Sequence, residues 1–122
     1  MGTGNANKSE IYQFLQSFRE CPNIILLSHR KVGKDKRLLD RLAISTSDAI
    51  EICKALRVSN YFMGPKADFN AERKKRGEKI WEFKKSLESV VVYIKLQVRL
   101  QPKDQAIIIS FHEDEFGKEN LS

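Results

Sequence analysis

Residues 90–100 constrain the fold most, because apolar and polar side chains alternate along them almost without interruption. Every even position is apolar: Val90, Val92, Ile94, Leu96, Val98 and Leu100. After Val91, the odd positions are Tyr93, Lys95, Gln97 and Arg99. Because successive side chains of a strand point to opposite faces, this period of two predicts a strand with one buried face.

Two flanking stretches predict further strands of the same antiparallel sheet. In residues 79–85, Trp81 and Phe83 fall on one face, and in residues 106–113, Ile107, Ile109 and Phe111 do. If these apolar sets face a common core, the opposite face gathers polar side chains from all three strands: Glu82, Lys84, Tyr93, Lys95, Gln97, Arg99, Ser110 and His112. A carboxylate, a phenol, an imidazole and several cations on one surface make it the candidate functional face.

Upstream of these strands the pattern is mostly helical. We interpret residues 1–8 as a flexible leader, Ser9 as the cap of a first helix that ends at Cys21, and residues 24–27 as a strand buried on both sides at the sheet edge. A basic loop (residues 28–37) leads into a short helix that buries leucines at positions 38, 39 and 42. Ser45 and Asp48 predict a capping box on the next helix, which places Cys53 in the core.

The middle of the chain carries turn and charge signals. Gly64 and Pro65 indicate a turn, and residues 66–78 read as a charged loop. Its basic run, Arg73, Lys74, Lys75 and Arg76, is either a solvated loop or a phosphate-binding loop.

The resulting element order is helix, strand, two helices, three strands. This order predicts one α+β domain over residues 9–116, with helices on one face of a twisted antiparallel sheet and a tail at 117–122. The expected core is Phe14, Leu15, Phe18, Ile52, Leu56, Trp81, Phe83, Val92, Ile94, Leu96, Ile107, Ile109 and Phe111.

Composition narrows the partners. A net charge of +6 and a pI near 9.4 favour a polyanion such as nucleic acid, although a basic solubility surface explains them equally well. Two cysteines without a CxxC spacing predict neither a zinc site nor a disulfide framework, as is typical of the cytoplasm. We expect no membrane association, because no apolar run has membrane-spanning length.

The strand motifs resemble a known family. Ile-Trp-Glu at 80–82, Val-Tyr-Ile-Lys-Leu at 92–96 and Ile-Ile-Ile-Ser-Phe-His-Glu at 107–113 are similar to the C-terminal half of the MqsR family. Ser-Asn-Tyr-Phe at 59–62 occupies the position where that family has a similar Ser-Asp-Phe-Tyr sequence. The resemblance covers roughly the last half of the chain. It implies a RelE-like fold and an mRNA interferase toxin that cleaves mRNA, free or on the ribosome, without a metal or cofactor and is held inactive by a cognate antitoxin.

The resemblance also implies site residues. The family's glutamine after Ile-Trp falls on Glu82, its strand tyrosine on Tyr93 and its lysine after Ser-Phe on His112. A further family lysine falls on Met63, with Lys66 the nearest cation.

Metal-independent RNA cleavage needs a base for the 2′-hydroxyl, a cation for the phosphate and an acid for the leaving oxygen. Glu82 and His112 are the acid–base types required, and histidine ordinarily titrates near neutrality. We expect Tyr93 to join them, and RNA to be held by a larger basic set: Lys66, Arg73, Lys74, Lys75, Arg76, Lys84, Lys95 and Arg99.

Non-catalytic roles are also possible for the same residues. A histidine at a strand end can be merely solvated, and a strand tyrosine can serve only packing. The alternative functions are a non-enzymatic nucleic-acid-binding module and a protein-interaction domain.

Overall fold

The computed structural model describes residues 6–27, 34–100 and 104–114. Most of the predicted leader, the predicted tail and the first part of the predicted basic loop lie outside these residues. No helix within the described ranges has the length and apolar composition needed to cross a membrane.

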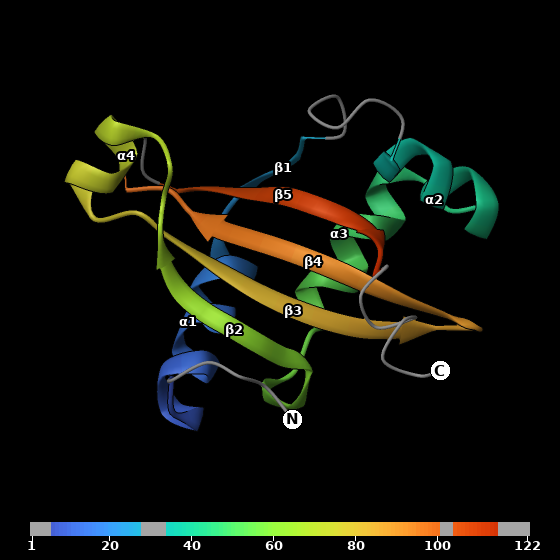
Figure 1. The fold of residues 1–122 in the computed structure, drawn as a ribbon, viewed down its shortest axis with the longest axis horizontal. Coiled ribbons are helices and arrows are strands. Elements are labelled where there is room, and N and C mark those ends of the chain that lie inside the picture. The colour runs from blue at the N-terminus through green and yellow to red at the C-terminus, as the bar shows by residue number, and fades with distance from the viewer. Residues whose placement is uncertain (1–5, 28–33, 101–103, 115–122) are drawn as a thin grey trace.

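The chain folds as a mixed sheet with the longer helices packed against one face (Figure 1). The helices are α1 (Lys8–Glu20), α2 (Lys34–Leu42), α3 (Thr46–Lys54) and α4 (Ala71–Arg76), with a 3-10 turn at Val58–Asn60. The strands are β1 (Asn23–Leu26), β2 (Tyr61–Ala67), β3 (Lys79–Leu87), β4 (Val90–Val98) and β5 (Gln105–Glu113). The spatial order of the strands is β1-β5-β4-β3-β2. The α+β class is therefore confirmed.

Two of these elements were not predicted. Residues 61–67 form β2, which pairs antiparallel with β3, and residues 71–76 form the short helix α4. The predicted turn at Gly64 is an irregularity inside β2, where the backbone has φ +121° and a Cβ would lie 2.9 Å from the carbonyl oxygen of Ile80. Asn70 caps α4 and Gly77 ends it in the left-handed region. These local signals were hidden in a run of charged residues.

The first strand also differs from its prediction. β1 does lie at the sheet edge, but it pairs parallel with β5, so the sheet is mixed rather than antiparallel. It is not buried on both sides either, because Ile25 is 40% exposed. Ile25 pairs with Ile107, which places it on the sheet face opposite the helix-side core and so leaves it accessible to solvent.

The three predicted strands pair as expected, with one shift of register. β3, β4 and β5 form a meander in which Phe83, Ile94 and Phe111 align across the helix-covered face. Between the pairs Lys95–Ser110 and Leu96–Ile108, Ile109 is an extra residue, a β-bulge. The bulge reverses the alternation, so Ala106 and Ile108 face the helices. Ile107 and Ile109 therefore point to the opposite face rather than to the helices, so the predicted direction of these two side chains is wrong. Ile107 is nevertheless buried, as expected of a core residue, whereas Ile109 is only partly buried.

The core lies between the sheet and the helices behind it in Figure 1. Fully buried side chains include Phe18, Phe83 and Phe111, and Phe14 stacks on Trp81 at a centroid distance of 4.7 Å. Phe14, Trp81 and Ile52 are only partly buried. Cys53 is a core residue, as predicted, and burial raises the pKa of its thiol.

The helix caps follow the predicted chemistry with one displacement. Ser45 and Asp48 form the expected capping box on α3. On α1 the cap is Asn7, whose side chain accepts from the Glu10 amide, so the helix begins before the predicted Ser9. Asn7 is the cap rather than Ser9 because Glu10 lies three residues after Asn7 and completes a capping box with it.

Candidate functional site

The sheet face away from α1 and α3 carries the predicted polar residues. The pairing register places Lys84, Tyr93 and His112 in one row across β3, β4 and β5, and Glu82, Lys95 and Ser110 in the next. We call this surface the open face. It exists because the period-two pattern of β3 and β4 directs most of their apolar residues, such as Phe83 and Ile94, to the helices on the opposite face.

Tyr93 stands at the centre of a hydrogen-bonded group. Its hydroxyl donates to Glu82 Oε1 at 2.6 Å, and Glu82 Oε2 lies 2.8 Å from Lys66 Nζ. Lys66 comes from β2, the strand that the sequence did not predict. Both carboxylate oxygens of Glu82 are therefore engaged, although its side chain is only 5% exposed.

These contacts set the protonation states. Burial alone would raise the pKa of the Glu82 carboxyl, but the hydrogen bonds from Lys66 and Tyr93 outweigh burial and lower it. Burial and the adjacent Glu82 carboxylate raise the pKa of the Tyr93 hydroxyl. At neutral pH the pair is thus a carboxylate that accepts and a phenol that donates.

His112 lies on the other side of Tyr93 from Glu82. The two ring centroids are 5.3 Å apart, and the His112 Nδ1–H donates to the Glu113 carbonyl oxygen at 3.0 Å. That bond leaves Nε2 as the atom able to exchange a proton with a ligand. Since β4 separates β3 from β5 and the two residues lie in neighbouring rows, Glu82 and His112 are roughly 12 Å apart at the backbone. We call Lys66, Glu82, Tyr93 and His112 the tyrosine cluster.

Lys84 is held at the edge of this cluster. Its ammonium lies 2.8 Å from Asp114 Oδ2 and 4.0 Å from the centre of the Phe62 ring. Asp114, directly after β5, is almost fully buried. One of the predicted RNA-binding cations thus already has a protein carboxylate beside it.

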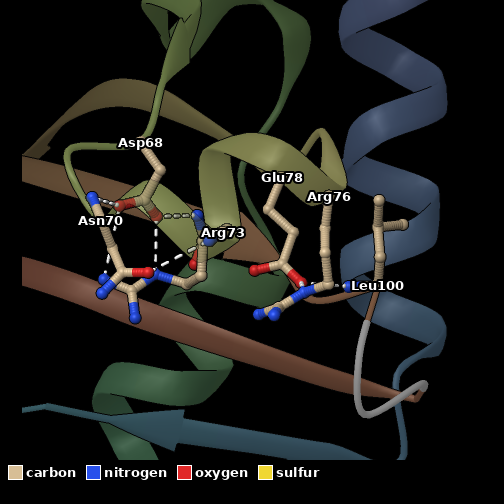
Figure 2. A network of polar contacts seen from close by, with 7 residues as sticks. Asp68, Asn70, Arg73, Arg76, Glu78 and Leu100 are labelled. Carbon is tan, nitrogen blue, oxygen red and sulfur yellow. Dashed lines mark hydrogen bonds and ion pairs between the residues drawn. The ribbon is translucent and has the colours of Figure 1, made fainter.

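The basic run of α4 divides into paired arginines and exposed lysines. Figure 2 shows Arg73 and Asn70 converging on Asp68, and Arg76 converging with the Leu100 amide on Glu78. Both carboxylates are buried, so the arginines neutralise charges that would otherwise be costly to bury. Lys74 and Lys75 are exposed and make no ion pair with any described residue.

Asp68 connects α4 to the sheet. Arg73 donates to it through Nε at 2.8 Å and Nη2 at 3.3 Å, and Gln97 Nε2 on β4 donates to Oδ2 at 2.6 Å. Burial acts to raise the pKa of the Asp68 carboxyl, yet these donors and the Asn70 amide lower it to about 2. Asp68 thus anchors the short helix over one end of the open face.

A pocket of about 270 Å³ lies beneath this anchor. Its polar lining is Asp68, Arg73, Lys95, Gln97, Arg99 and Ser110, and its apolar lining is Phe69, Ile80 and Ile109. We call it the open-face pocket. Lys95 joins it to the tyrosine cluster, because its ammonium also lies 5.8 Å from the centre of the Tyr93 ring.

Two residues of this lining each have a buried side-chain atom with no hydrogen-bond partner among the described residues: Gln97 Oε1 and Arg99 Nε. Gln97 is 0% exposed, and a buried polar atom left unpaired costs about 1–3 kcal/mol. Burial and the nearby Arg73 lower the pKa of the Arg99 guanidinium. Native proteins keep few such orphans, and these two atoms of the pocket lining have hydrogen-bonding capacity left for a ligand.

The sequence did not indicate Asp68 or Phe69 as site residues. Asp68 meets Gln97 across 29 positions of chain, and no local pattern encodes that contact. Phe69 follows Asp68 and is 95% exposed. A single aromatic residue in a charged stretch of sequence does not indicate whether its side chain is buried or exposed. Predicting the strand at residues 61–67 would have been the first step, because this strand ends directly before Asp68 and Phe69 and so places both beside the open face.

Metal ligands and similarity to known proteins are the remaining possible indications of function. Within the described ranges, no three histidine, cysteine, aspartate or glutamate side chains gather as a metal site would require. Comparison of the chain with protein-family models, curated proteins and solved structures found no match.

Proposed function

We propose that this protein is a metal-independent endoribonuclease, an mRNA interferase toxin of a type II toxin–antitoxin system that acts in the cytoplasm. The observation that carries the proposal is the tyrosine cluster: a carboxylate, a phenol and an imidazole in series across three strands of one basic face. Helices on the opposite face of the sheet agree with the RelE-like arrangement that the MqsR resemblance implies.

Glu82 is the base in this proposal. Its carboxylate is deprotonated at neutral pH, but its Oε2 atom is engaged by Lys66. The Lys66 side chain is 47% exposed, so an arriving phosphate can compete for its ammonium. Transfer of Lys66 to the phosphate frees Oε2 to accept the 2′-hydroxyl proton, while the Tyr93 hydroxyl holds Oε1 in place.

His112 is the acid. With Nδ1 bound to a backbone carbonyl, the Nε2–H of the imidazolium can protonate the leaving 5′-oxygen. The separation from Glu82 suits an in-line reaction, in which the attacking and leaving oxygens lie on opposite sides of the phosphorus. Lys66 and Lys95 supply the charge that stabilises the crowded phosphate.

The test is cleavage of labelled RNA, free and on ribosomes, by purified wild-type protein and three variants. His112→Ala and Glu82→Gln should each lose on the order of a hundredfold or more in rate, since each removes a proton-transfer group. Tyr93→Phe, which only loosens Glu82, should lose less. Expression of His112→Ala should also no longer arrest growth.

Matched surface changes serve as controls. Tyr12→Phe on α1 and Glu51→Gln on α3 make the same chemical changes at exposed positions far from the open face and should cleave normally. Absence of cleavage by wild-type protein on every RNA and on ribosomes would overturn the proposal.

A non-enzymatic nucleic-acid-binding module is the second candidate. One observation favours it: both oxygens of Glu82 are engaged, as they would be in a purely structural network. In that case RNA binds, no RNA is cleaved, and the three variants bind it as wild type does. A cognate antitoxin remains part of the first proposal alone, and its co-expression should relieve growth arrest.

A further inference from the structure

The open-face pocket is built for a neutral ring with hydrogen-bonding edges rather than for a bare anion. The cations Arg73, Lys95 and Arg99 line the pocket, but they share it with two acceptors. These acceptors, the Asp68 carboxylate and Gln97 Oε1, would repel a phosphate placed against them. Ile80 and Ile109 add apolar walls. A nucleobase satisfies both features, because its faces are apolar and its edge carries donors and acceptors.

The two orphan atoms define what that edge must offer. The Gln97 Nε2 group donates to Asp68, so the orientation of the amide is fixed and Oε1 is an acceptor in need of a donor. Arg99 Nε is a donor in need of an acceptor. A base edge with a donor beside an acceptor pairs both atoms at once.

Phe69 supplies the remaining contact. Its ring is 95% exposed at the lining of the pocket, held there between Asp68 and the helix α4 that Asp68 anchors. A large aromatic side chain in water gains stability only when something covers it, and exposed aromatic rings beside cations are the usual stacking platforms for unpaired bases.

We propose that the open-face pocket binds one unstacked base of single-stranded RNA, with Phe69 stacking on it and Gln97 and Arg99 reading its edge. This rests on the proposed function in that the RNA strand continues past Lys95, so its next phosphate lies at the tyrosine cluster. The volume, about 270 Å³, is just below that of pockets for drug-sized ligands, so it takes one base and not two.

The test measures binding without cleavage. Short RNA oligonucleotides with 2′-O-methyl groups cannot be cut by a reaction that needs the 2′-hydroxyl, and fluorescence anisotropy gives their affinity. Each oligonucleotide is compared with a series in which one nucleotide at a time is abasic. For wild-type protein, loss of one particular base should weaken binding about tenfold or more.

Protein variants complete the thermodynamic cycle. Phe69→Ala should weaken binding of the intact oligonucleotide by a similar factor. This variant should bind the abasic oligonucleotide no more weakly than it binds the intact one. Because Phe69 is almost fully exposed, this variant should fold normally. Tyr12→Ala removes another exposed aromatic ring, from α1, and should bind as wild type does. Arg99→Lys keeps the charge but removes the Nε donor, so it should weaken binding to the intact strand and leave binding to the abasic one unchanged.

The outcomes separate this inference from the proposed function. If RNA is cleaved but the Phe69→Ala and Tyr12→Ala variants bind alike, or no abasic position matters, the base pocket is refuted and the ribonuclease stands. If the abasic effect is present but no RNA is cleaved, the pocket stands and the catalytic proposal fails. Failure of wild-type protein to bind any oligonucleotide at low salt refutes both.

Discussion

Asp68→Asn should destabilise the protein in a pH-dependent way. Asp68 receives hydrogen bonds from Arg73, the Asn70 amide and Gln97, and it is 5% exposed. The substitution keeps the shape of the side chain, removes its charge and replaces one acceptor oxygen with an NH₂ group that faces other donors. The network that holds α4 on the sheet is therefore weakened without creating a cavity.

The magnitude follows from the pKa of this carboxyl. A decrease from the ordinary value of 3.8 to about 2 corresponds to about 2 kcal/mol of folding free energy at neutral pH. Because the folded-state pKa is the lower one, this stabilisation is fully present above the unfolded pKa and is lost as the pH falls through the folded value. Wild type and variant should therefore differ most above pH 4–5 and converge towards pH 2.

Urea unfolding followed by the fluorescence of the single tryptophan, Trp81, measures this difference between pH 7 and pH 2.5. Glu51→Gln is the control, because Glu51 pairs with Lys54 at the surface and should contribute less than about 1 kcal/mol. A variant as stable as wild type at pH 7 would refute the role of Asp68 as an anchor. A loss that is the same at every pH would show that shape rather than charge is responsible.

Two further outcomes test the binding surface and the core. Replacing Lys74 and Lys75 together with alanine should weaken RNA binding equally for all sequences and lower the slope of log affinity against log salt by roughly 0.7 per lysine, as salt titrations would measure; an unchanged slope would show that these lysines are only solvated. Phe83→Ala should cost about 3–5 kcal/mol in urea unfolding because Phe83 is fully buried, whereas Phe69→Ala should cost almost nothing, and equal losses would contradict the assigned burial.

The open face was predictable because it depends only on side-chain alternation. A strand has a strict period of two, so the apolar set of residues 90–98 fixes the direction of Tyr93 and Lys95 wherever the strand lies. The adjacency of His112 to Tyr93 followed once the third strand was placed beside the second. Asp48 and Ser45 were equally readable, because a capping box is a local pattern.

Apart from the short helix α4 and the cap of α1, whose signals are local, the features that were missed depend on contacts distant in sequence. The bulge at Ile109 inserts one residue into β5, and an uninterrupted run of isoleucines gives no sign of where the alternation reverses. β2 contains Gly64 and Pro65, which ordinarily indicate a turn, and is stabilised as a strand only by its pairing with β3. The open-face pocket requires Asp68 to reach Gln97, which no periodicity specifies.

The role of His112 as the acid that protonates the leaving 5′-oxygen can be tested by changing the leaving group. An RNA substrate with sulfur in place of the bridging 5′-oxygen needs no acid, because a thiol is far more acidic than an alcohol.

We predict that His112→Ala cleaves ordinary RNA on the order of a hundredfold or more slowly than wild type, but cleaves the 5′-sulfur substrate within a few-fold of the wild-type rate. An equal loss on both substrates, or no loss on either, would contradict the account.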